Sequence, residues 1–164
     1  MKIIKTLTLT CIISAFISIF ALAADGVIYF SDPVCNAGDT VTVEMKIQSD
    51  NGSVGDATVL LKYPSDSIVF VEGNDADGGA GTLRIHGVSN GKDTGLATYA
   101  LKFRTPYAGD FSITLDTYEV YDSDGNAVSI SHAGSSLISV AANENASSDS
   151  TLSNLEVSPG ELTP

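Results

Sequence analysis

GDTVTVEMKIQSDNGSVGDATVLLKYPSDSIVFV, residues 38–71, is the stretch of the sequence that decides the fold. Within residues 40–48 every second residue is apolar and the residues between are polar, which is typical of a strand with one buried face. Residues 50–53 tolerate a chain reversal, and the alternation resumes at residues 57–63. The Pro64-Ser65-Asp66 run then ends that strand. The pattern predicts sheets with one wet face each, stacked as an all-β sandwich.

Further short strands are expected on both sides of this stretch. One begins at residues 68–71, and the others cover residues 27–30, 82–86, 96–104, 111–115, 118–121 and 137–140, with Gly-, Asn- and Pro-containing turns between them. The second long alternation, residues 96–104, places Tyr99 and Phe103 inward. About nine short strands without a helical period predict a β-sandwich with jelly-roll topology.

The first 23 residues predict a signal peptide. They carry Lys2 and Lys5, an apolar run, and Ala21-Leu22-Ala23, whose small residues fit a signal peptidase. The run is too short for a membrane helix, so we expect no membrane span in the mature chain. We therefore expect a secreted protein, extracellular or at the cell surface, with residues 25–141 as its β-sandwich domain. Residues 142–150 are polar and small, which is typical of a linker.

Charge excludes one class of partner. The chain has 8 Lys and Arg against 20 Asp and Glu, a net charge of −12, and loss of Lys2 and Lys5 makes it about −14. Nucleic acid is excluded, because its binding depends on neutralising phosphates. Cys35 is left as the single cysteine after cleavage, so no internal disulfide forms.

Two segments carry a family resemblance. AGDTVTVEMKI at residues 37–47 and ATVLLKYPSDSIVFVEG at residues 57–73 resemble the opening of a cohesin domain, and the resemblance covers about residues 27–140. It implies a jelly-roll sandwich that binds a dockerin, a small Ca²⁺-loaded domain attached to polysaccharide-degrading enzymes, in a bacterial cellulosome-like scaffold. Residues 151–164 look like the truncated start of a cadherin-like β-sandwich repeat.

The sequence does not predict an enzyme. His86 and His132 are the two imidazoles, and neither lies in a nucleophile motif. Asp122, Asp124 and Asn126 place oxygen ligands at alternate positions around a glycine, as Ca²⁺ loops begin, but no Glu follows at the twelfth position. A hairpin turn that uses Asp-Gly is the simpler interpretation. We expect no required cofactor, with Ca²⁺ in a structural role at this turn as a hypothesis.

The resemblance also implies where a partner binds, because cohesins use the sheet of their third, fifth, sixth and eighth strands. By order these are residues 57–63, 82–86, 96–104 and 118–121. Their outward positions give the predicted binding residues, Leu60, Lys62, Arg84, His86, Lys102 and Arg104. Such a basic patch would suit an acidic, Ca²⁺-loaded partner, although Lys and Arg face outward on any strand.

Two other functions compete with dockerin binding. A carbohydrate-binding module would take a polysaccharide as its partner, and such faces commonly rely on exposed aromatic rings. This chain has no Trp, and Tyr107, Tyr118 and Tyr121 are the candidate exposed rings, without a regular stripe. An adhesin or cell-wall spacer with a cohesin-like fold and no dockerin partner is the remaining alternative.

Overall fold

The structure is a computed structural model that describes residues 24–50 and 52–143. In this part of the chain the regular elements are strands: β1 (Ala24–Phe30), β2 (Val34–Asn36), β3 (Thr40–Ser49), β4 (Asp56–Lys62), β5 (Val69–Gly73), β6 (Ala76–Gly79), β7 (Thr82–His86), β8 (Leu96–Arg104), β9 (Gly109–Tyr121), β10 (Val128–Ala133) and β11 (Ser136–Ala141). No helix among these residues is long and apolar enough to cross a membrane. The predicted signal peptide and cadherin-like start lie outside the described residues.

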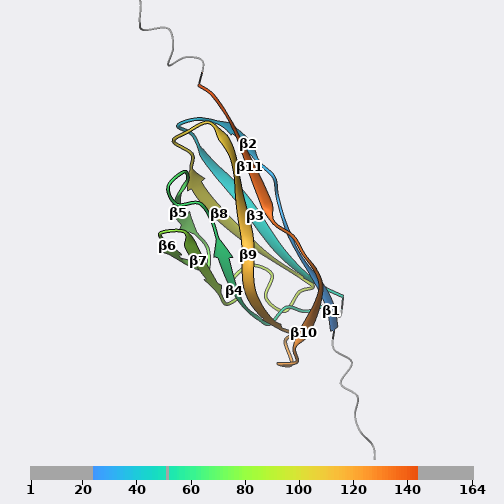
Figure 1. Cartoon of the computed structure of the whole chain (residues 1–164). Helices are drawn as coiled ribbons and strands as arrows, with labels where there is room; N and C mark the ends of the chain where they lie inside the picture. The colour runs from blue at the N-terminus through green and yellow to red at the C-terminus, as the bar shows by residue number, and fades with distance from the viewer. Residues whose placement is uncertain (1–23, 51, 144–164) are drawn as a thin grey trace, which may run out of the picture.

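Two sheets stack as a sandwich (Figure 1). The first sheet has the strand order β10-β1-β3-β8-β5, and the second has the order β2-β11-β9-β4-β7-β6. The predicted all-β sandwich is therefore confirmed. The longest ladder joins β3 to β8, the two strands whose alternation is clearest in the sequence, from Thr40 opposite Arg104 to Gln48 opposite Leu96.

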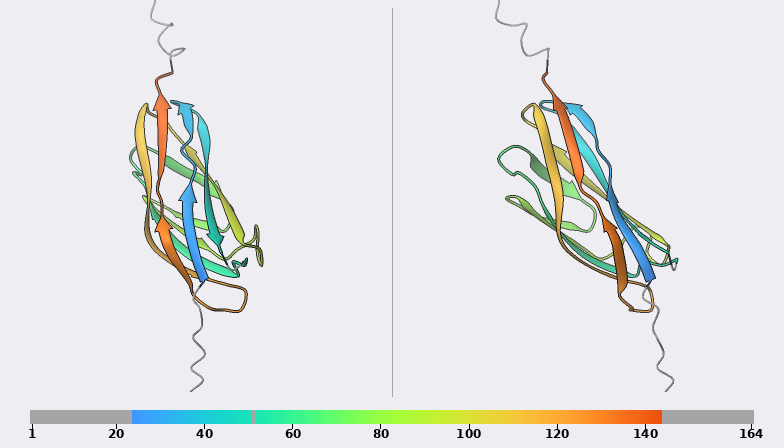
Figure 2. Two further views of the ribbon diagram at one scale, coloured as in Figure 1. Left: turned by 90° about the vertical axis from the view of Figure 1, so that its right-hand side faces the viewer. Right: turned by 45° about the vertical axis from the view of Figure 1, so that its right-hand side comes forward.

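Both end segments of the described chain pass from one sheet to the other. β1 pairs with β3 in the first sheet, and after Pro33 the chain enters the second sheet as β2. The chain makes the matching change between β10 and β11. β10 runs parallel to β1 and β11 runs parallel to β2, so the two segments lie side by side along the sandwich (Figure 2). Pro33 fits this change because its lack of an N–H interrupts pairing.

The core lies between the sheets and is built from the inward positions of both. Tyr99, Phe103, Met45, Leu61 and Ile113 are among its fully buried side chains. Tyr99 keeps its hydroxyl satisfied by donating to the Gly87 carbonyl oxygen at 3.0 Å. The Phe103 ring packs edge-on against Tyr63 and Phe70.

One glycine has a clear steric reason. Gly91 has φ = 83°, and a Cβ there would lie 1.9 Å from the Leu96 carbonyl oxygen. This turn carries the chain from β7 in the second sheet to β8 in the first. A side chain at position 91 would therefore force the crossing loop to move.

The strand list differs from the expected one in two ways. β2, β6 and β10 are additional short strands. VCN of β2 and ADGG of β6 have only three and four residues, and VSISHA of β10 alternates only from Val128 to Ser131. The predicted strands at residues 111–115 and 118–121 are one continuous strand, β9. Its register against β4 shifts between Leu60 and Leu61, where Asp116 is the extra residue. A bulge of this kind reverses the alternation, which made one strand look like two.

Candidate partner-binding face

The outer face of β9, β4, β7 and β6 is the candidate site, and we call it the β4–β7 face. Burial alternates strictly along β4 and β7, with Ala57, Val59, Leu61, Leu83 and Ile85 inward. The ladders with β7 and β9 then fix which outward side chains are neighbours. The face carries Asp56, Thr58, Leu60, Lys62, Thr82, Arg84, His86, Asp77, Thr114, Asp116, Thr117, Glu119 and Tyr121.

Leu60 lies at the centre of this face. Its register partners are Arg84 on β7 and Thr117 on β9, so a cation and a hydroxyl flank it from the two neighbouring strands. Leu60 is half-buried by these neighbours, while Arg84 is exposed. The strand ladder thus places an apolar side chain beside a guanidinium on an open surface. That pair can contribute both apolar contact and bidentate hydrogen bonding to a partner.

Two predicted binding residues of the face, Lys62 and His86, contact acids within the chain. The Nζ atom of Lys62 lies 2.7 Å from Oδ1 of Asp116, the bulge residue of β9. The Nε2 atom of His86 lies 2.6 Å from Oδ2 of Asp77 on the edge strand β6. Both pairs are exposed, so their electrostatic energy is small and screened by salt. The Lys62–Asp116 pair does reduce the positive charge that the face presents.

The placement of Lys102 and Arg104 on this face is wrong. Both belong to β8, which pairs with β3 and β5 in the first sheet, on the other side of the sandwich. The physical reason is the crossing loop after β7, because alternation tells inside from outside but not one sheet from the other. The single basic patch predicted from the sequence does not form. The part that Leu60, Lys62, Arg84 and His86 play in binding stays a prediction.

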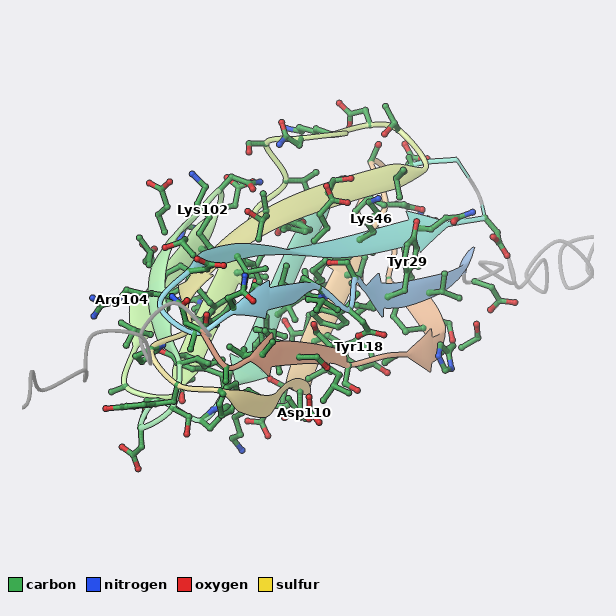
Figure 3. The ribbon with its side chains drawn as sticks, turned by 90° about the horizontal axis from the view of Figure 1, so that it is seen from above. Tyr29, Lys46, Lys102, Arg104, Asp110 and Tyr118 are labelled. Atoms are coloured by element: carbon green, nitrogen blue, oxygen red, sulfur yellow. The ribbon has the colours of Figure 1, made fainter. Side chains whose placement is uncertain are left out.

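The outer face of the first sheet gathers several of the remaining cations. Figure 3 shows Lys46 and Lys102 on one side of the sandwich and Asp110 of β9 on the other. Lys102 Nζ lies 2.5 Å from Glu72 Oε1, and this hydrogen bond and ion pair lower the pKa of the Glu72 carboxyl. The Glu44 carboxylate, 2.9 Å from Lys46 Nζ, likewise raises the pKa of Lys46. Arg104 makes no ion pair with any residue that the structure describes.

A shallow hollow on the same sheet lies between β5 and β8. It is lined by Glu72, Gly73, Asn74, Ala100 and Lys102. The Asn74 amide continues the strand pairing, since its Oδ1 accepts from the Ala100 N–H at 2.7 Å and its Nδ2 donates to the Thr98 carbonyl at 3.3 Å. The Asn74 amide and the Lys102–Glu72 pair of the hollow are therefore engaged in contacts within the chain.

The turn after β9 is organised by Asp122. Its Oδ1 accepts from the backbone N–H groups of Asp124 at 3.0 Å and Asn126 at 2.8 Å, and its Oδ2 accepts from the Asn126 amide at 3.2 Å. The Asp122 side chain is buried, whereas Asp124 is exposed. No group of three or more His, Cys, Asp or Glu side chains in the described chain is arranged to hold a metal ion. The Ca²⁺ hypothesis for this turn stays a prediction.

The two histidines do not share a site. His86 ends β7 in the second sheet, and His132 lies on β10 in the first. The tyrosines also do not form a flat aromatic platform. Tyr121 faces outward opposite Asp56, Tyr118 faces the opposite way opposite Val59, and Tyr107 lies in the loop between β8 and β9.

Sequence reasoning missed the acids of the face. Asp77 is on a short Gly-rich strand that reads as a loop, and Asp116 sits at the bulge, so neither had an assigned direction. Glu119 lies on a predicted strand and Asp56 directly precedes one. The sequence did not show, however, that these two strands are neighbours in one sheet. The acids at outward positions could have been counted in the sequence together with the bases, because a partner responds to the summed charge of a face.

The described residues form an all-β sandwich of two sheets, and the β4–β7 face lies on the outside of the second sheet. No family model matches the sequence, and no curated protein matches it. Solved structures do match. A non-cellulosomal cohesin from the hyperthermophilic archaeon Archaeoglobus fulgidus is 20% identical, with a TM-score of 0.60, over 75% of this chain and 96% of that one.

Two further matches come from bacterial complexes. A chain of the type I Coh-OlpA–Doc918 cohesin–dockerin complex from Clostridium thermocellum is 11% identical, with a TM-score of 0.58, over 71% of this chain and 99% of that one. A chain of the sixth cohesin of Acetivibrio cellulolyticus scaffoldin B in complex with a Cel5 dockerin mutant is 18% identical, with a TM-score of 0.57, over 70% and 99%. The described chain therefore has the cohesin fold, which confirms the resemblance seen in the sequence.

Proposed function

We propose that this chain is a non-catalytic protein-binding module that takes a dockerin-type partner on the β4–β7 face. The observation that carries the proposal is the second sheet, whose outer face lies open with Leu60 and Arg84 side by side at its centre. Matched structures named as cohesin–dockerin complexes support the class of partner.

The proposal extends to location and setting. A signal peptide at residues 1–23 would export the module to the cell surface or medium, and a dockerin-bearing partner would tie it to polysaccharide breakdown. Sugar binding by the module itself has less support, because Tyr118 and Tyr121 face opposite sides of the second sheet and Tyr107 lies in the loop between β8 and β9.

Calorimetric titration tests the proposal. Residues 24–143 are titrated with Ca²⁺-loaded dockerins, namely Doc918, the Cel5 dockerin and the dockerin-like domains encoded with this chain. We expect at least one to bind with a Kd of about 1 μM or tighter and to lose binding when EDTA removes its Ca²⁺. Absence of binding across the panel would overturn the dockerin assignment.

Charge-reversal variants then locate the face. Leu60→Asp with Arg84→Glu should abolish the binding while the melting curve stays nearly unchanged, because both side chains point outward. Lys102→Glu with Arg104→Glu is the matched control, with two substitutions on the first sheet, and should retain the wild-type Kd. Loss of binding in the control alone would move the site to the first sheet.

A further inference from the structure

The charges of the β4–β7 face are ordered along its strands. The ladders define three successive rows: Leu60 with Arg84, Thr117 and Asp77, then Thr58 with Glu119 and His86, then Asp56 with Tyr121. The Arg84 guanidinium therefore lies in the central row, and the Glu119 and Asp56 carboxylates lie toward the end where β4 begins. The chain as a whole is negatively charged, so its composition alone does not explain a cation at the centre of this face.

Contacts within the chain determine which of these charged side chains remain available to a partner. Lys62 is paired with Asp116, and His86 holds the Asp77 carboxylate at 2.6 Å. Asp77 is the register partner of Arg84, but its carboxylate contacts His86 and makes no ion pair with Arg84. Arg84 itself makes no ion pair with any described residue.

The acidic end is also unpaired. Neither Asp56 nor Glu119 makes an ion pair within residues 24–50 and 52–143, and both are exposed. Asp56 Oδ1 accepts from the Ala57 N–H at 2.9 Å, which fixes the carboxylate at the start of β4. Arg84, Asp56 and Glu119 are thus charged residues of the face that lie outside every ion pair among the described residues.

Strand geometry sets the spacing of these charges. Two residues along a strand advance about 7 Å, so Glu119 lies about 7 Å and Asp56 about 13 Å along β4 from the Arg84 row. Two turns of an α-helix advance about 11 Å. Consider a helix that lies along β4 and carries an acid and a base two turns apart. When its carboxylate pairs with Arg84, its ammonium therefore lies between Glu119 and Asp56.

We propose that the β4–β7 face selects a partner helix with an acid that pairs with Arg84 and a base, two turns away, that pairs with Asp56 and Glu119. This proposal rests on the proposed function of the same face and adds the charge pattern of the partner. Leu60, in the same row as Arg84, supplies the apolar contact under the helix. Opposite charges at both ends fix the direction in which the helix lies, because reversal would place like charges together.

A displayed helix library tests this without knowledge of the natural partner. A three-helix scaffold with one randomised exposed helix face is selected on phage against residues 24–143, with counter-selection on the Leu60→Asp variant to remove binders of other surfaces. We expect the selected helices to be enriched in an acid and a base about two turns apart. Selection of apolar or uniformly charged helices, or of none that depends on Leu60, would overturn the proposal.

Charge exchange in the selected binders gives the second readout. Arg84→Glu should weaken each binder about tenfold or more, and changing the binder's acid to Lys should restore the affinity. Arg104→Glu on the first sheet is the control and should leave the affinity unchanged. Equal losses in both variants would show a nonspecific field effect and overturn the pairing.

The dockerin titrations separate the two proposals. If no dockerin binds while library helices show the charge pattern, the dockerin assignment fails and the pattern stands. If a dockerin binds equally well to wild type and Arg84→Glu, the pattern fails and the function stands.

Discussion

Removal of the Asp122 carboxylate should destabilise the domain without any involvement of Ca²⁺. The carboxylate accepts hydrogen bonds from two backbone N–H groups, at 3.0 and 2.8 Å, and from the Asn126 amide. Only 8% of the Asp122 surface is exposed. Hydrogen bonds to a charged group contribute about 1.5–3 kcal/mol each, and partial access of water to the turn lowers this. We expect Asp122→Ala to cost about 2–4 kcal/mol.

Melting curves measured by circular dichroism test this expectation. For a domain of this size, about 3 kcal/mol lowers the Tm by about 10 °C. Asp122→Asn keeps one acceptor oxygen and should lie between wild type and Asp122→Ala, while Asp124→Ala on the exposed neighbour is the control and should stay within about 2 °C of wild type.

The same curves, recorded in millimolar Ca²⁺ and in EDTA, separate a turn from a cation site. A ligand that binds only the folded state raises its stability in proportion to the logarithm of its concentration. The hydrogen-bond account predicts coincident curves for wild type in both buffers. A wild-type melting curve that rises with Ca²⁺ and loses this response in Asp122→Ala would refute that account and support the Ca²⁺ hypothesis made from the sequence.

Two more predictions follow from single contacts. Tyr99→Phe should cost about 1–2 kcal/mol, because the Gly87 carbonyl loses its donor at 3.0 Å, whereas Tyr107→Phe on the exposed loop should change the free energy of unfolding negligibly in urea titrations. Lys102→Met should raise the pKa of Glu72, measured by NMR, because the Lys102 hydrogen bond and charge lower it in the wild type. Since the folded pKa is lowered, the stabilising effect of this pair is present above the ordinary glutamate pKa of 4.5 and is lost as the pH falls through the folded pKa.

Local periodicity was sufficient to predict the class of fold. The alternation at residues 40–48 and 96–104 appears as β3 and β8, and the inward positions Val43, Tyr99 and Leu101 are all fully buried. This works because burial on one side of a sheet imposes a period of two on the sequence. The edge strand β6 could not be predicted in this way, because its Ala76-Asp77-Gly78-Gly79 sequence pairs through the backbone and carries little side-chain pattern.

The candidate site was predictable strand by strand but not as an assembled face. Leu60, Lys62, Arg84 and His86 do share one face, since β4 and β7 are neighbours in the second sheet. Lys102 fails because the assignment of β8 to a sheet depends on a loop crossing that leaves no trace in the period of the strand. Sheet membership is a long-range property, set by which pairs of strands bury the most apolar surface together.

The position of β8 changes the kind of recognition that the face can perform. With Lys102 and Arg104 on the other sheet, and with Lys62 and His86 paired to Asp116 and Asp77, the face has no excess of positive charge to attract an acidic partner over long range. Attraction at a distance would come from summed charge, whereas Arg84 beside Leu60 acts at contact. Substitution of Arg84 should therefore increase the dissociation rate constant far more than it lowers the association rate constant. A variant in which the association rate constant falls in step with the affinity would show long-range steering instead.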